Sequence, residues 1–132
     1  MTNFKTVTIM NKREHAIAKI KEYIEIREKR LQVLQEIAND NMNRFIRSYS
    51  EEYYKFKNEV DKFQAIQNVL ETKTQTDESA MEFLRYIQND IKDYLVRNHP
   101  MESSSSPMAC LTSVWECEVK QKIFQLIEFC LL

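Results

Sequence analysis

The residues that most often carry catalysis are sparse in this sequence and are not grouped. His15 and His99 lie far apart, and neither has a serine, cysteine or carboxylate at a spacing that would pair a nucleophile with a base. The sequence contains no glycine, which excludes the glycine-rich loops that cradle phosphates and dinucleotides. We therefore predict a protein that is not an enzyme.

Cysteine is a second residue type here that could bind a metal. The three cysteines, Cys110, Cys117 and Cys130, lack the closely spaced pair that zinc sites use, so we predict no metal and no other cofactor. Their odd number and their confinement to the last quarter of the chain differ from the disulfide framework of a small secreted domain. Since no signal sequence or long apolar segment is found either, we expect an intracellular protein, cytoplasmic or nuclear, without a membrane span.

Aromatic side chains crowd one short stretch, SYSEEYYKFKNEVDKF, at residues 48–63. They could form a ligand cage, a surface that stacks nucleic-acid bases, or the buried seam of a coiled coil. The lysines between them are balanced by glutamate and aspartate, which argues against base stacking. Their spacing is that of a heptad repeat, which favours the seam, and only Tyr54 lies off the repeat. Tyr54 is therefore the ring that we predict to make an external contact.

A serine-rich segment contains one candidate for modification. Ser106 precedes Pro107, which is the context of proline-directed phosphorylation. A phosphate there would place negative charge shortly before the last predicted helix. Such a charge would modulate how that helix docks.

Charge restricts the kind of partner. Nineteen basic and twenty acidic residues give a net charge of −1, which argues against nucleic acid as a partner. Residues 1–30 are nevertheless rich in lysine and arginine. A basic N-terminal end that binds nucleic acid or phospholipid is therefore kept as a third hypothesis.

The elements that carry these residues are expected to be helices. With no glycine, only two prolines and 30% charged residues, the composition favours long helices, and we predict an all-α fold. After a disordered leader at residues 1–10, an N-cap at Asn11 with Glu14 starts a long coiled-coil helix over residues 11–72. Its apolar positions follow two heptad registers and form the predicted association seam: Ile17, Ile20, Ile24, Leu31, Leu34, Met42, Ile46, Tyr49, Tyr53, Phe56, Val60, Phe63 and Leu70.

The two registers are offset by one residue at residues 38–45, and two interpretations of this junction compete. In one, the helix continues and the supercoil relaxes. In the other, the chain breaks and a new helix starts, since Ser48 precedes Glu51 with capping-box spacing. Several poor helix formers lie here, among them Asn39 and Asn43, but neither glycine nor proline does. We favour the continuous helix.

Three further segments follow the long helix. Thr76 is expected to cap a return helix at residues 77–98 that folds back on the distal half of the long helix. Residues 99–110 form a Ser-rich flexible linker, and residues 111–132 form an apolar C-terminal helix. That helix either closes the core of the bundle, which we favour, or docks into a partner's groove through Trp115, Val119, Ile123 and Leu126.

The sequence thus predicts association through helices and leaves the biological process open. The first hypothesis is a coiled-coil assembly or scaffold subunit in an intracellular complex of the cytoskeletal, centrosomal, kinetochore, chromosome-axis or vesicle-tethering type. Its partner would be a protein, either a second copy or a different chain, since so long a helix cannot bury its apolar stripe alone. The alternative is a monomeric helical-bundle adaptor that binds a helix or peptide of another protein.

Overall fold

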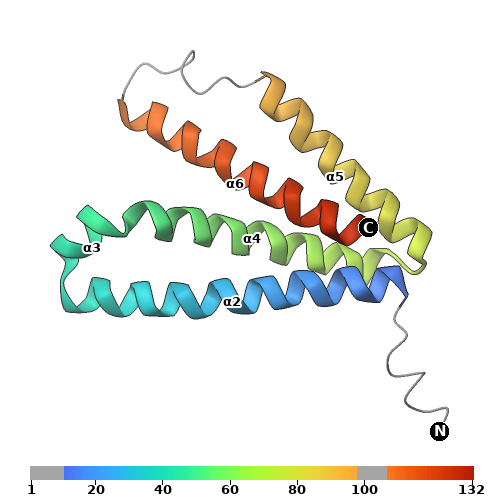
Figure 1. Cartoon of the computed structure of the whole chain (residues 1–132), viewed down its shortest axis with the longest axis horizontal. Coiled ribbons are helices and arrows are strands. Elements are labelled where there is room, and N and C mark those ends of the chain that lie inside the picture. Colours follow the sequence, from blue (N-terminus) through green and yellow to red (C-terminus); the bar gives the residue numbers. More distant parts are fainter. Residues whose placement is uncertain (1–10, 98–106) are drawn as a thin grey trace, which may run out of the picture.

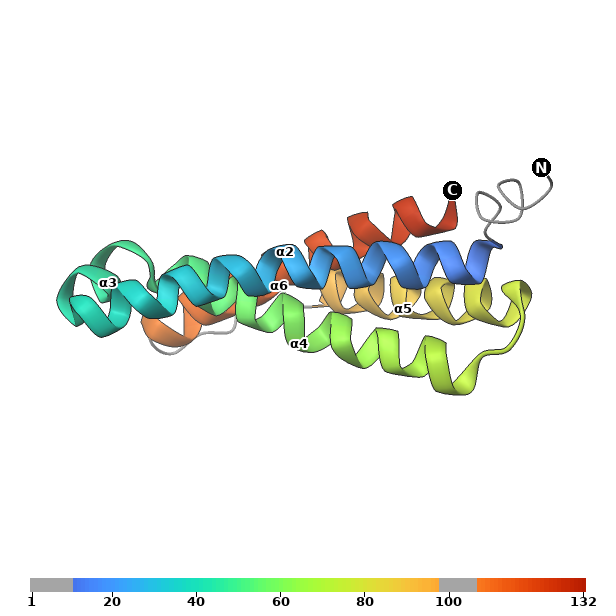
Figure 2. The same ribbon diagram turned by 90° about the horizontal axis from the view of Figure 1, so that it is seen from below.

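The computed structural model describes residues 11–97 and 107–132, with side chains in the second range from residue 111 onwards. The described residues form helices and no strand, which confirms the predicted all-α fold. Four long helices lie alongside one another, and a short one joins two of them at one end (Figure 1, Figure 2). In chain order they are α2 (Lys12–Asp40), α3 (Met42–Ser48), α4 (Ser50–Lys73), α5 (Asp77–Arg97) and α6 (Pro107–Leu131).

The predicted continuous helix over residues 11–72 is wrong, because the chain reverses direction near Asn41. Asn41 has an extended backbone, with φ −151° and ψ 94°, and so separates α2 from α3. Its side-chain oxygen accepts a hydrogen bond of 3.1 Å from the backbone N–H of Arg44, which caps the new helix. α4 then returns antiparallel to α2, so the two halves of the predicted long helix pack against each other (Figure 1).

A second interruption, at Tyr49, leaves α3 as a short corner at the end of the hairpin. None of the residues of α3 is buried. Met42 and Ile46, both predicted for the seam, are 54% and 56% exposed there. Neither joins the core of the described chain, because the corner lies beyond the end of the interface between α2 and α4. Their place in an association seam stays a prediction.

The remaining seam residues are buried to different depths. The buried ones are Ile20, Ile24, Leu34, Val60, Phe63 and Leu70. The partly buried ones are Ile17, Leu31, Tyr49, Tyr53 and Phe56. Much of the burial of the two heptad rows therefore occurs within one chain, whereas the sequence alone suggested that a second chain would be needed.

At the other end of the hairpin, Arg13 ties three helix ends together. Its guanidinium donates to the carbonyl oxygens of Leu70 (3.0 Å) and Glu71 (3.4 Å) and to the hydroxyl of Thr74 (3.1 Å), at the C-terminus of α4. Its backbone N–H donates to the carboxylate of Asp77, 3.1 Å away at the start of α5. A cation at a helix C-terminus satisfies the last carbonyls. Arg13 is thus occupied inside the bundle, which weakens the hypothesis of a basic end that binds phosphate.

α5 occupies Asp77–Arg97, close to the predicted 77–98. The hydroxyl of Thr76 accepts a hydrogen bond of 3.0 Å from the N–H of Ser79, as a cap should. The main neighbours of α5 are α6 and α2. The predicted packing along the distal half of the first helix is wrong, because α6 takes the position beside α4 (Figure 1).

α6 completes the bundle between α4 and α5 (Figure 1). Val119 and Ile123 are buried in the core, and Trp115 and Leu126 are partly buried, so this helix is used inside the chain. It begins at Pro107, before the predicted start at residue 111, because proline suits the first helical position, where its missing N–H leaves no bond unmade. The predicted leader at residues 1–10, and Ser106 with most of the predicted linker, lie outside the described residues.

Candidate functional site

The histidine and cysteine side chains are the first candidates for a reactive or metal-binding site. His15 is exposed, and His99 lies outside the described residues. No group of three or more His, Cys, Asp or Glu side chains in this part could hold a metal ion. Burial raises the pKa of the Cys130 thiol to about 11 and also raises the pKa of Cys117. Both thiols therefore stay protonated at neutral pH, unlike reactive cysteines.

Apolar side chains line an open groove on the surface of the bundle. None of the helices in the described ranges combines the length and the apolar composition needed to cross a bilayer. An apolar groove of about 480 Å³ does open where α3, the first turns of α4 and the start of α6 meet. We refer to it as the aromatic groove, and its lining residues are Phe45, Ile46, Ser50, Tyr53, Tyr54, Lys57, Asn58 and Trp115.

Two ring pairs build the walls of the aromatic groove. Phe45 of α3 and Tyr53 of α4 pack edge to face, with ring centroids 5.6 Å apart and an interplanar angle of 74°. Tyr54 of α4 and Trp115 of α6 lie 5.2 Å apart with an angle of 50°. Aromatic pairs in these geometries add to the burial energy of the rings. The pairs fix three helices around one opening.

Tyr54 was predicted to contact an external partner, and the structure gives it two environments. One contact is internal, with Trp115 of α6. Partial burial, together with the nearby charge of Glu116, raises the pKa of the Tyr54 phenol, so the hydroxyl stays protonated. The ring also lines the open groove. Tyr54 thus both contacts α6 and lines the open groove.

Polar groups at the edge of the groove are engaged with the backbone or with each other. The hydroxyl of Ser50 donates to the carbonyl oxygen of Ile46 (2.8 Å), which braces the break between α3 and α4. The amide of Asn58 donates to the carbonyl oxygen of Tyr54 (2.8 Å). Lys57 forms an exposed ion pair of 3.4 Å with Asp61. The surface of the groove therefore consists mainly of carbon atoms and aromatic rings.

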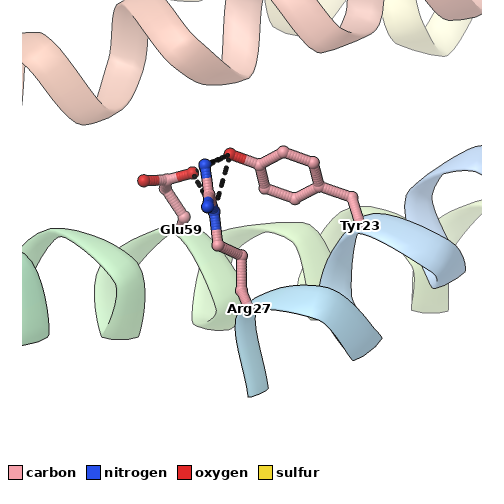
Figure 3. Close-up of polar contacts among 3 residues, drawn as sticks. All are labelled: Tyr23, Arg27 and Glu59. Atoms are coloured by element: carbon pink, nitrogen blue, oxygen red, sulfur yellow. Dashed lines mark hydrogen bonds and ion pairs between the residues drawn. The ribbon is translucent and has the colours of Figure 1, made fainter. Parts of the chain in front are cut away.

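A buried polar cluster links α2 to α4 near the groove (Figure 3). Glu59 is only 3% exposed, and its carboxylate accepts a hydrogen bond from the hydroxyl of Tyr23. The guanidinium of Arg27 lies 3.5 Å from the same carboxylate oxygen and donates to the Tyr23 oxygen at 2.9 and 3.1 Å. Buried charges are tolerated when they are paired and hydrogen bonded in this way.

The cluster extends along the interface between α2 and α4 toward the corner. The guanidinium carbon of Arg27 lies 4.0 Å from the ring centroid of Phe56 and 4.8 Å from that of Tyr23, within the range of cation–π attraction. Arg30 forms two hydrogen bonds with Glu52, of 2.7 and 3.0 Å. Each of these contacts requires one particular alignment of the two helices. They therefore hold the two helices of the hairpin in register.

The stability of the fold at alkaline pH is expected to depend on the Tyr23 phenol. Burial, reinforced by the carboxylate of Glu59, raises the pKa of Tyr23 well above its ordinary value of 10.0. Above that pH the unfolded chain has lost this proton and the folded chain keeps it, so the free energy of unfolding falls as pH rises. We expect the wild type to lose about 1.4 kcal/mol per pH unit more than Tyr23→Phe.

Urea unfolding of both proteins at several pH values on either side of 10.0 measures this difference. The quantity compared is the change in the free energy of unfolding per pH unit, not the absolute stability. Tyr54 and Tyr94, whose pKa values burial also raises, are present in both proteins and cancel. Equal slopes in the two proteins would show that the Tyr23 hydroxyl titrates normally.

Parts of this site could not be found in the sequence. Trp115 and Tyr54 are distant in the chain, and no local sequence pattern indicates that their rings are in contact. Glu59 and Tyr23 were not singled out either. One signal was present, since Arg27 occupies the gap in the first heptad row, where a charged residue needs an oppositely charged partner on the facing helix.

Comparison with protein-family models, with curated proteins and with solved structures finds no match for the chain. A helical bundle alone does not specify a function, because the same architecture serves many. The function has to be argued from the surface that the bundle presents.

Proposed function

We propose that the protein is a non-enzymatic helical-bundle adaptor that binds a helix of another protein in the aromatic groove. The observation that carries the proposal is the groove itself, an opening lined by rings from three helices. Ligand-binding clefts have volumes in this range and are lined mainly by apolar and aromatic side chains. Aromatic side chains are also enriched among the residues that dominate the binding energy of protein interfaces. This favours the adaptor hypothesis over assembly through a long coiled coil.

A helix suits the groove better than an extended strand. The described residues contain no strand, so there is no sheet edge for a partner strand to extend. Amphipathic helices bind grooves between helices by inserting apolar side chains spaced three or four residues apart. The aromatic groove lies between helices and has the volume for one or two large side chains.

Ile46→Asp tests the proposal. Ile46 lines the groove and is 56% exposed, so the change places charge in the groove without opening the core. We expect peptides selected by the wild type from a displayed random library to bind Ile46→Asp roughly 30-fold more weakly, as loss of an interface anchor does. Trp115, the sole tryptophan, lines the groove and reports binding by its fluorescence.

Ile26→Asp is the matched control, because Ile26 has the same exposed fraction of 56% and lies on α2, outside the groove. It should bind the selected peptides as the wild type does. If no peptide is enriched on the wild type relative to Ile46→Asp, the groove is not a binding site.

A second candidate function is assembly through helices, the first hypothesis from the sequence, here with a second copy of the chain as the partner. Ile26 and Val33 are one heptad apart on α2 and both are exposed, at 56% and 43%. A second helix packed along this stripe would make the protein a subunit of a larger helical complex. Sedimentation equilibrium tests it, since Ile26→Asp together with Val33→Asp should then convert an oligomer to a monomer, whereas Ile46→Asp should not.

A further inference from the structure

The charges beside the aromatic groove are unbalanced. In the sequence of α3, Arg44 and Arg47 flank the groove-lining residues Phe45 and Ile46, and no acidic residue lies in this helix. Among the described residues, neither arginine is within ion-pair distance of a carboxylate. The Arg44 guanidinium lies over the ring of Tyr49, 5.8 Å from its centroid. Neither arginine is thus engaged in an ion pair in the described residues.

Other basic residues at this end of the bundle are neutralised. The ammonium group of Lys55 contacts the carboxylates of Glu51 and Glu118. Lys62 lies 3.9 Å from the carboxylate of Glu116. These pairs join α4 to α6 or stay within α4. These basic side chains of α4 are thus already paired with carboxylates.

Lys57 is the charged residue in the lining of the groove. Its pair with Asp61 is exposed on both sides, and such pairs contribute little to stability, so a carboxylate of a partner can replace Asp61. Asp40, at the end of α2, brings one negative charge close in sequence to the two arginines of α3. Asp40 forms no ion pair with either arginine in the described residues.

We propose that the occupant of the aromatic groove is an amphipathic helix whose apolar anchor is flanked by aspartate or glutamate. This inference rests on the proposed function and specifies its class of partner. The rings would receive the apolar side chains, while Arg44, Arg47 and Lys57 would contact the carboxylates. Complementary charge around an apolar centre speeds association and rejects partners of the wrong sign. A basic amphipathic helix would bring like charges together and bind poorly.

The same features fit a lipid surface less well. Attraction of a protein to anionic membranes typically uses a cluster of about four to eight basic residues. Two arginines and one lysine fall short of that number. The apolar residues here also form a concave groove, whereas an interfacial helix inserts a continuous apolar face into the bilayer.

The test compares the wild type with the double variant Arg44→Glu/Arg47→Glu, using a displayed library of random-sequence peptides as the probe. Peptides selected by the wild type should combine apolar residues three or four apart with Asp or Glu nearby. They should bind the double variant roughly tenfold more weakly. A synthetic peptide with those acidic residues changed to lysine should regain affinity for the double variant.

Each outcome has a separate meaning. Selection of apolar peptides without acidic residues would overturn the inferred partner class and leave the adaptor function standing. A lack of enrichment relative to Ile46→Asp would overturn the adaptor function itself. Retention of the wild type, but not the double variant, on phosphatidylserine vesicles, with no peptide selected, would assign the corner to lipid. Circular dichroism verifies the fold, and Arg44→Gln/Arg47→Gln replaces the double variant if the charge reversal unfolds the corner.

Discussion

Phe63→Ala is expected to lower the free energy of unfolding by about 3–5 kcal/mol. Phe63 is fully buried, at 0% exposed, and its ring meets the edge of Tyr23 with centroids 5.0 Å apart. Removing it opens a cavity at the centre of the interface between α2 and α4, close to the polar cluster, where the neighbours cannot collapse without breaking hydrogen bonds. Since domains of this size are stable by about 5–15 kcal/mol, the loss is a large fraction of the total.

Urea unfolding followed by circular dichroism measures this loss. Phe129→Ala provides the matched control, because the same side chain is 63% exposed on α6. Its effect should stay within about 0.5 kcal/mol. Similar effects of the two changes would mean that the core is not centred on Phe63.

Glu59→Ala is expected to lower the free energy of unfolding by about 3 kcal/mol, near the lower end for breaking a buried ion pair. The change removes the acceptor for the Tyr23 hydroxyl and the counter-charge of Arg27, both in the interior between α2 and α4. The Arg27 side chain is 22% exposed, so water offsets only part of the loss. Every buried side-chain polar atom in the described residues has a partner, and this variant would leave some without one.

Replacing the whole cluster should have a much smaller effect than breaking it. The triple variant Tyr23→Phe, Arg27→Met, Glu59→Leu is expected to recover most of the stability lost in Glu59→Ala, because no polar group is then buried alone. Glu51→Ala, which removes an exposed pair with Lys55, should change stability by no more than about 1 kcal/mol. A triple variant less stable than Glu59→Ala would contradict this account.

The fold class and several helix boundaries were predictable because they depend on local chemistry. A chain without glycine and with two prolines favours helices throughout. The start of α2 at Asn11 and of α5 at Thr76 follows from side-chain caps, and the predicted Asn11 bond to the N–H of Glu14 is present at 2.7 Å. Such signals involve residues three positions apart and are readable in sequence.

The reversal at Asn41 was not predictable from the same signals. Asn39, Asn41 and Asn43 are poor helix formers, but a helix can continue through such residues when its faces are buried. The choice was decided by long-range packing, since the hairpin lets the two heptad rows share a core with α5 and α6. The offset between the two registers marks this break in the helix and not a local change of supercoil.

The cluster of aromatic rings at residues 48–63 partly indicated the groove in the sequence. Periodicity singled out Tyr54 but could not show that Trp115, far along the chain, would lie against it. In the sequence, only the position of Arg27 in the apolar row indicated the buried polar cluster. Glu59, next to Val60, could not be distinguished from an exposed acidic residue. Contacts between distant segments depend on the tertiary arrangement, which periodicity does not contain.

The lack of any buried residue in α3 has a consequence for the dynamics of binding. With little burial to hold it, this corner should open locally at low free energy and exchange its amide hydrogens faster than the Arg13 end of the hairpin. A partner would then lose part of its binding energy to the entropy of ordering the corner. In return, the groove wall can adapt its shape, so related helices of different side-chain size could share one site with moderate affinity and rapid release.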